Sequence, residues 1–193
     1  MSIIPAFQIG VWNAWIFMVP FLLINILLVI LMIKKGAPGG PSRVPCKSKT
    51  TLLVASASKI IYFPAIIYSV FLPLKLGTIW FYAGLPITLV GLVGSTVVVV
   101  NWANTPAGKP VTRGIYRYSR HPMYVTEVLL LFGVSIASAS WVFLLFPIVI
   151  GVGAVYFIKI EEAYTIGHYG KAYSEYMNRT PKWIGIPKSE KKE

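Results

Sequence analysis

An uncharged apolar stretch opens the sequence, at residues 10–33. Its 24 residues would form roughly 36 Å of α-helix, whereas a lipid hydrocarbon core is about 30 Å thick. Such a stretch predicts a helix that spans a membrane. No positive residue precedes it, and it is longer than the apolar part of a signal peptide, so we expect it to remain in the protein as a span.

Four further apolar stretches follow, at 52–72, 76–100, 123–138 and 141–158. The last two are joined by Ala-Ser-Ala-Ser and are expected to form a helical hairpin. The stretch 76–100 carries small residues that would let another helix approach closely; they are Gly84, Gly91, Gly94 and Ser95. Because 56% of the residues are hydrophobic and only 12% are charged, the expected fold is all-α, a polytopic membrane protein with five transmembrane helices.

Cations are distributed unevenly among the segments between these stretches. With the N-terminus outside, five of the 18 Lys and Arg residues fall in the first inner loop (34–50), four in the second and seven from Lys159 onward, against Lys75 alone outside. Cytoplasmic loops carry such an excess. We therefore expect a cytoplasmic C-terminus, and we attribute the net charge of +12 to orientation and anionic lipid, with no nucleic-acid partner.

Polar side chains gather at residues 109–124, KPVTRGIYRYSRHPMY. Gly114 permits a tight bend, and Pro122 suits the first position of a helix. Arg120 and His121 would then lie beside the positive end of that helix, where backbone N–H groups are unpaired. The segment predicts a site for an anionic group, although a basic loop that only orients the chain would have the same composition.

A second polar segment follows the fifth apolar stretch. Glu161 and Glu162 begin it and point about 100° apart on a helix. Residues 169–177 place Tyr169, Tyr173 and Tyr176 on one face, which predicts a helix lying along the membrane surface. This segment has two interpretations. In the structural one it is a hydrated helix end followed by a helix that anchors the chain at the membrane interface. In the functional one the surface helix covers a bound ligand.

Glu127 is the acidic residue inside an apolar stretch. A charge there is costly unless it is paired or hydrated. Glu127 is therefore either the partner of a nearby cation or part of a cavity wall, and we favour the structural partner.

The two polar segments together resemble a known signature. Arg120-His121-Pro122-x-Tyr124, then Glu161-Glu162, Gly170-x-x-Tyr173-x-x-Tyr176 and Arg179-x-Pro181 are similar to the motifs of the isoprenylcysteine carboxyl methyltransferase and phospholipid methyltransferase families of integral membrane enzymes. Two positions depart from that pattern, with Ile115 in place of Pro and Tyr169 in place of Phe. The resemblance covers about the last 85 residues.

This resemblance implies S-adenosylmethionine as the cofactor. The implied cofactor-binding residues are Gly114, Tyr116, Arg120, His121, Pro122, Tyr124, Glu161 and Tyr173, and the implied catalytic residues are Arg179 and Glu162. Arg179 would orient an acceptor carboxylate. No GxGxxG or P-loop pattern is present, so helix ends and the tail are expected to hold the cofactor. His121 and His168 lack the spacing of a metal site, and no metal is expected.

The predicted function is methyl transfer to a lipophilic acceptor, most closely carboxyl methylation of a prenylcysteine. Phospholipid amine N-methylation is the alternative within the family; an NADPH-dependent sterol-type reductase and a non-catalytic membrane adaptor are alternatives from other classes. Residues 1–108 would form the first three membrane helices, and 109–193 the catalytic region. We expect a prenylated or other lipophilic substrate, membrane lipid as a partner and no obligate protein partner. The membrane would be the plasma membrane in a prokaryote or the endoplasmic reticulum in a eukaryote.

Overall fold

The computed structural model describes residues 7–34 and 61–188. Within these ranges the chain forms six α-helices and no strand, so the all-α prediction is confirmed. The helices are α1 (Trp15–Lys34), α3 (Tyr62–Val70), α4 (Ile79–Ala103), α5 (Pro122–Ala137), α6 (Trp141–Tyr169) and α7 (Lys171–Arg179), with a short 3-10 helix, η1 (Gly114–Arg117), before α5.

Three of the described helices, α1, α4 and α6, are long and apolar enough to cross a membrane. This chain is an integral membrane protein. α5 is also apolar but has only 16 residues. The first part of the predicted second span, 52–60, lies outside the described residues, and the remainder contains the short helix α3. The linker 35–50 lies entirely outside the described residues. The count of five spans therefore stays a prediction.

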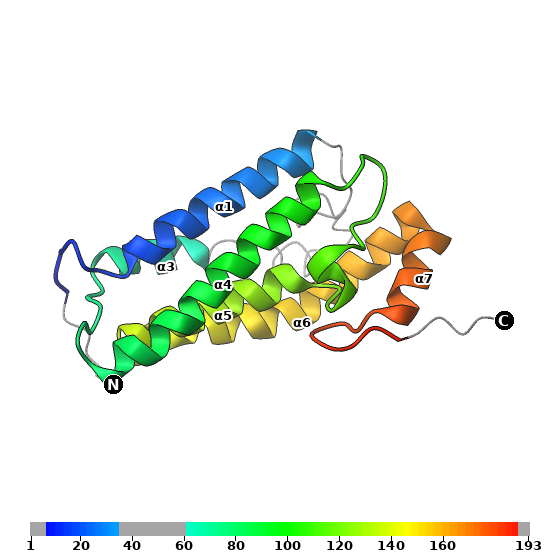
Figure 1. The fold of residues 1–193 in the computed structure, drawn as a ribbon. Coiled ribbons are helices and arrows are strands. Elements are labelled where there is room, and N and C mark those ends of the chain that lie inside the picture. Colours follow the sequence, from blue (N-terminus) through cyan, green and yellow to red (C-terminus); the bar gives the residue numbers. More distant parts are fainter. Residues whose placement is uncertain (1–6, 35–60, 189–193) are drawn as a thin grey trace.

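The helices α1, α4, α5 and α6 run side by side along the molecule, with η1 and α7 at one end (Figure 1). α6 has 29 residues, or roughly 44 Å at 1.5 Å per residue. It is longer than the predicted stretch 141–158 because the helix continues through the polar residues that follow. α6 is therefore longer than a hydrocarbon core is thick, which is about 30 Å.

α4 and α5 pack with their backbones in close approach. A Cβ atom added to Gly91 would lie 2.5 Å from the backbone N of Leu130, and one added to Gly84 would meet the backbone of Gly133 and Ala137. Ser95 adds a hydrogen bond across the pair, to Thr126 Oγ1 at 3.1 Å. The prediction that these small residues admit another helix is confirmed, and the helix they admit is α5.

The predicted hairpin of α5 and α6 is also confirmed. The chain reverses through Ser138 and Ala139, whose φ is +51°. Ser140 caps α6, because its side-chain oxygen accepts a hydrogen bond from the backbone N–H of Phe143 at 3.1 Å. This turn sets α5 against α6, so that residues near the start of α5 face residues near the end of α6.

Candidate active site

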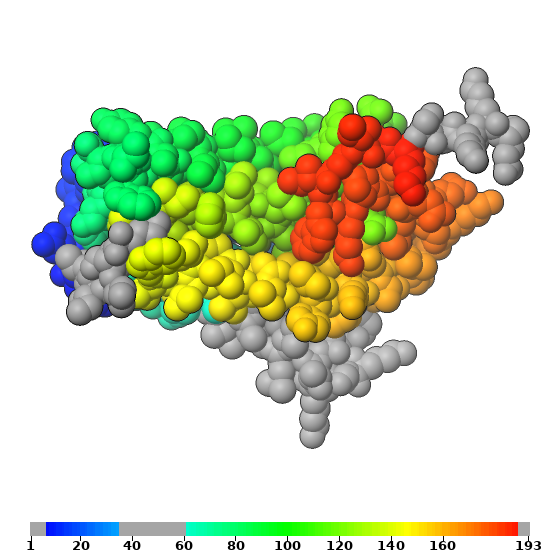
Figure 2. Space-filling model, turned by 90° about the horizontal axis from the view of Figure 1, so that it is seen from below, coloured from blue at the N-terminus to red at the C-terminus, as the bar shows by residue number. Residues whose placement is uncertain are grey.

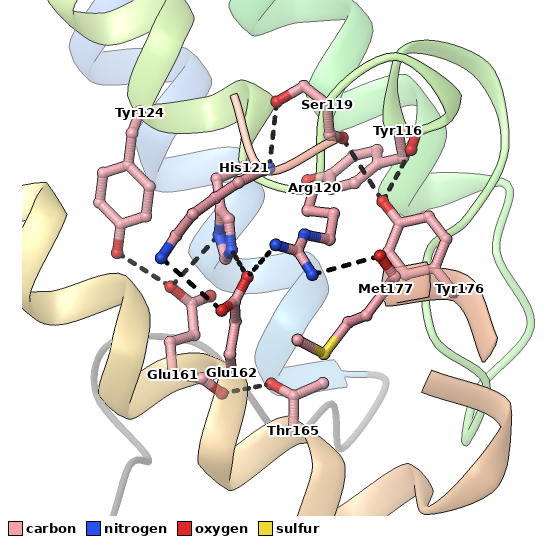
Figure 3. Close-up of polar contacts among 11 residues, drawn as sticks. Tyr116, Ser119, Arg120, His121, Tyr124, Glu161, Glu162, Thr165, Tyr176 and Met177 are labelled. Carbon is pink, nitrogen blue, oxygen red and sulfur yellow. Dashed lines mark hydrogen bonds and ion pairs between the residues drawn. The ribbon is translucent and has the colours of Figure 1, made fainter. Parts of the chain in front are cut away.

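The site lies at the end of the bundle where η1, the start of α5, the end of α6 and α7 meet (Figures 1 and 3). Gly114 has a φ of +63°, and a Cβ atom there would collide with the Asn101 side chain, so the predicted bend requires glycine. α5 begins at Pro122, with His121 in the cap position. The two polar segments predicted from sequence thus come together.

Glu162 is the centre of a buried ionic cluster. Its Oε1 lies 3.0 Å from His121 Nε2 and 3.3 Å from an Arg120 guanidinium nitrogen, and its Oε2 lies 3.8 Å from Lys182 Nζ. The Arg120 and Glu162 side chains are only 12% and 11% exposed. The predicted anion at Arg120 and His121 is therefore, in this structure, the protein's own carboxylate.

Glu161 faces a different set of partners. Its Oε2 accepts a hydrogen bond from the Tyr124 hydroxyl at 3.1 Å and lies 3.9 Å from His121 Nδ1. One helical turn later, Thr165 Oγ1 donates to the Glu161 carbonyl at 2.7 Å. His121 thus lies between the two glutamates, and Figure 3 shows both carboxylates directed at it.

Buried tyrosines line the same region. The Tyr176 hydroxyl donates to the Tyr116 carbonyl at 2.7 Å, and the Tyr116 hydroxyl accepts from Trp102 Nε1 at 2.9 Å. Burial raises the pKa of Tyr116, Tyr173 and Tyr176 above the usual value for tyrosine. These hydroxyls therefore stay protonated at neutral pH and act as neutral hydrogen-bonding groups.

The tail after α7 is joined to the first polar segment by backbone hydrogen bonds. The Arg120 N–H donates to the Pro181 carbonyl at 3.0 Å, and the Gly185 N–H donates to the Tyr118 carbonyl at 3.0 Å. The Arg120 side chain also reaches the Met177 carbonyl at 3.4 Å. α7 and the tail therefore cover the ionic cluster from outside the bundle.

Together these elements line a cavity of about 60 Å³ that is partly open to solvent. The wall is largely aromatic and apolar, with four polar or charged side chains that are not tyrosines or tryptophans. It comprises Met32, Trp102, Pro110, Val111, Tyr116, Arg120, His121, Met123, Tyr124, Glu161, Thr165, Tyr169, Tyr173 and Tyr176.

Six of the residues predicted from the resemblance line this cavity: Tyr116, Arg120, His121, Tyr124, Glu161 and Tyr173. Four do not. Glu162 lies behind Arg120 and His121, Pro122 is buried at the start of α5, and Gly114 and Arg179 line a neighbouring pocket. The structure therefore brings most of the predicted cofactor residues together but does not bring Arg179 to the cavity.

Sequence reasoning missed several residues of this wall and cluster. Trp102 and Met32 belong to α4 and α1, which carry no motif, and Lys182 reaches Glu162 from the tail. Tyr169 and Tyr176 had a signal, because they share the amphipathic face with Tyr173. The other residues had none, since the pairing of helix ends is decided by packing.

Glu127 has a partner that its sequence position did not indicate. Its Oε2 accepts a hydrogen bond of 2.5 Å from the hydroxyl of Tyr62, which begins α3. Among the residues that the structure describes, no cation lies within ion-pair distance of Glu127, and Glu127 does not line the cavity. Among the described residues the partner of Glu127 is thus a tyrosine, which supports the structural role.

The fold is that of a helical integral membrane protein with an aromatic cavity where its helices end. The chain belongs to the phospholipid methyltransferase family, whose model matches residues 76–172, half of the chain. The matched residues extend from before α4 into the start of α7. They contain Arg120, His121 and both glutamates, whereas Arg179 lies beyond them.

Two curated relatives bear the same description, protein-S-isoprenylcysteine O-methyltransferase. The relative from Schizosaccharomyces pombe is 37% identical over 78 residues, and the one from Dictyostelium discoideum is 36% identical over 88 residues. Each match covers 40% of this chain and 32% of the relative. The chain therefore aligns with about a third of the length of these relatives.

Proposed function

We propose that this protein is an S-adenosylmethionine-dependent methyltransferase that acts on a lipophilic acceptor, and that its reaction is carboxyl methylation of a prenylcysteine. The observation that carries the proposal is the aromatic cavity beside the Arg120, His121 and Glu162 cluster. It lies at the end of membrane helices, where a water-soluble donor and an apolar acceptor can both arrive. The names of the two relatives support the choice of acceptor.

The cavity residues fit the chemistry of this cofactor. Tyrosine and tryptophan rings offer faces for an adenine ring and for a sulfonium cation, and Glu161 offers a carboxylate for hydroxyl, amino or sulfonium groups. Arg120 offers a guanidinium for the cofactor's carboxylate; its Nε is buried without a hydrogen-bonding partner among the described residues. When bound, S-adenosylmethionine supplies an electrophilic methyl group.

The residues of the chain would contribute alignment and exclusion of water. A carboxylate acceptor forms its new O–C bond as the S–C bond breaks, and the step needs no proton transfer. Because an anion and a cation give neutral products, removing water from the carboxylate favours the step, and fixed orientation supplies much of the remainder. Glu162 would act as a positioning residue, since it holds Arg120 and His121 from behind.

Arg179 is proposed as the anchor of the acceptor carboxylate. It lies at the end of α7, in the neighbouring pocket. Tyr176 lines both this pocket and the cavity. A guanidinium can hold a carboxylate through two parallel hydrogen bonds, which an ammonium cannot reproduce. Arg179→Lys should therefore lower turnover. We expect the activation free energy to rise by about 1.5–3 kcal/mol, the range for a hydrogen bond to a charged group, with little change in cofactor affinity. Wild-type turnover in this variant would remove Arg179 from the role.

The proposed topology has five spans, an external N-terminus and a cytoplasmic C-terminus, with α7 lying along the membrane surface. The unequal distribution of cations supports this orientation. The site would then face the cytoplasm, at the plasma membrane of a prokaryote or the endoplasmic reticulum of a eukaryote. Accessibility of cysteines introduced at Lys75 and Lys171 to an impermeant reagent tests it: Lys171 should react only from the cytoplasmic side.

Phospholipid amine N-methylation is the second proposal, because the matching family model carries that description. An ammonium acceptor must first lose a proton, so this reaction needs a base near the nitrogen. Glu161 is the carboxylate in the cavity wall that could receive the proton. The two reactions therefore differ in the group that the cavity must hold, an anion for the first and a cation for the second.

Transfer of a labelled methyl group tests both proposals. The purified protein would be incubated with S-adenosylmethionine labelled in the methyl group and, separately, a prenylcysteine, a prenylcysteine amide and a phosphatidylethanolamine. A methyl ester releases its label as methanol in base, whereas an N-methyl group does not. We expect base-labile label on the free prenylcysteine alone. Base-stable label on the lipid would establish the alternative, and no transfer with any acceptor would contradict the proposal.

A further inference from the structure

A second pocket lies on the other side of Tyr176 from the cavity. It has a volume of about 710 Å³ and is partly open to solvent. It is lined by Thr112, Arg113, Gly114, Arg117, Tyr176, Arg179, Thr180, Pro187 and Lys188. Four of these nine residues are cations and none is an acid, so the pocket presents positive charge to whatever enters it.

The cations come from two segments that the fold fixes together. Arg113 precedes η1 and Arg117 ends it. Arg179 ends α7, and the Lys188 N–H donates to the Arg179 carbonyl at 2.9 Å, which holds the tail beside the helix. Guanidinium groups form paired, charge-assisted hydrogen bonds with phosphate oxygens. The pocket therefore has the chemistry of a phosphate site.

An exposed apolar loop lies next to this pocket. Ile184 and Ile186 are 74% and 89% exposed, and Trp183 is 37% exposed. The hydrogen bond from the Gly185 N–H to the Tyr118 carbonyl, 3.0 Å, places this loop beside the end of η1. Figures 1 and 2 show the tail after α7 turning back alongside the helices. Isoleucines so placed are exposed to water in solution but fit the edge of a bilayer.

We propose that this basic pocket binds the headgroup of an anionic phospholipid, while the loop 183–186 enters the adjoining lipid layer. A negative phosphodiester would meet Arg113, Arg117 and Lys188, and the acyl chains would lie against the loop. Trp183 and Tyr118 are residue types enriched at membrane interfaces, and juxtamembrane cations attract anionic lipid. This site goes beyond the proposed methyl transfer, because it lies outside the cavity and does not require an acceptor there.

The lipid site and the cavity share one wall. Lys182 is directed inward, to Glu162 at 3.8 Å, whereas its neighbours Trp183 and Ile184 are exposed. Tyr176 lines both the cavity and the basic pocket, and its hydroxyl donates a hydrogen bond to the Tyr116 carbonyl. A lipid in the pocket would therefore fix the same tail that covers the cavity.

Lipid selectivity of the full chain, reconstituted in phosphatidylcholine bilayers, tests the proposal. Trace spin-labelled phosphatidylglycerol and phosphatidylcholine would report which lipid is immobilised by the protein. A cation near an anionic membrane surface contributes roughly fivefold to association. We expect the wild type to prefer phosphatidylglycerol, and Arg117→Ala with Lys188→Ala to lower that preference by at least about fivefold. Lys159→Ala with Lys171→Ala removes the same charge away from the pocket and should leave the preference unchanged.

Each other outcome overturns the site. Equal losses in both double variants would mean that net charge alone selects the lipid. An unchanged preference in the pocket variant would exclude the pocket. If Arg117→Ala with Lys188→Ala fails to fold, Ile184→Ser with Ile186→Ser serves instead, and it should weaken lipid immobilisation. Displacement of the lipid by millimolar inorganic phosphate, with no effect of the serine variant, would identify a soluble anion as the ligand and contradict the membrane assignment.

Discussion

The two ends of the helical bundle are held together by different forces. At one end, α4 and α5 meet backbone to backbone at Gly84 and Gly91, within a core that includes Met18, Leu130 and Phe143. At the other end, the same α5 begins beside an ionic cluster on Glu162 and a tyrosine-rich core. Close packing stabilises the first end. Polar contacts stabilise the second end, which also contains the cavity.

This difference teaches where the chain can change without losing its fold. Apolar helices gain little from burial against each other in lipid, so their association depends on close packing by small residues. The polar end is built from η1, the start of α5, the last turns of α6, α7 and the tail, and its ionic cluster is made by side chains. We therefore expect substitutions at the glycine end to affect folding first, and substitutions at the polar end to affect ligand binding and turnover first.

The largest effect is expected from Glu162→Ala. This change leaves Arg120 and His121 without their carboxylate, and breaking a buried ion pair costs about 3–5 kcal/mol. Because the Glu162 side chain is still 11% exposed to solvent, we expect a cost near the lower limit of this range. Turnover should fall by about 100-fold or more, measured with labelled S-adenosylmethionine.

Glu175→Ala is the matched control for this change. Glu175 forms an exposed pair with Lys171 at 3.9 Å, and such surface pairs contribute about 0–1 kcal/mol. Turnover in the control should stay within a few fold of wild type. If Glu162→Ala behaves like the control, the ionic cluster has no part in the reaction.

The next effect is expected from Gly91→Ala at the packed end. The added Cβ atom would lie 2.5 Å from the Leu130 backbone N, so α4 and α5 must separate, and overpacking costs about 1–3 kcal/mol. The midpoint of thermal unfolding in detergent should fall, while the folded fraction keeps its cofactor affinity. Gly153→Ala in α6, where a Cβ atom meets nothing within 4 Å, should be neutral. Equal stability of the two variants would contradict the packing account.

The smallest of these effects is expected from Tyr176→Phe. The change removes a hydrogen bond to the Tyr116 carbonyl of 2.7 Å, which is worth about 0.5–1.5 kcal/mol. Because this bond joins α7 to the first polar segment, the KM for S-adenosylmethionine should rise several fold with little change in kcat. Tyr156→Phe alters a tyrosine that is 63% exposed and should have no effect; a similar rise in KM there would show that Tyr176 has no special role.

The sequence was sufficient for most helix positions and for the meeting of the two polar segments. Apolar runs located α1, α4, α5 and α6, and the small residues of α4 indicated a close neighbour. Contacts between distant segments were not predictable. The pairing of Tyr62 with Glu127 joins residues 65 apart, and the direction of Arg179 depends on where the tail folds. No local pattern encodes either, because packing of whole helices decides both.

The central claim is that the cavity beside Arg120 binds S-adenosylmethionine. Calorimetric titration of wild type, Arg120→Ala and Lys159→Ala with this cofactor tests it most directly, because no acceptor is needed. We predict that Arg120→Ala weakens binding by about 1.5–3 kcal/mol, the value of a hydrogen bond to a charged group, whereas Lys159→Ala binds as wild type does. Wild-type affinity in folded Arg120→Ala, or no binding to the wild type, would contradict the account.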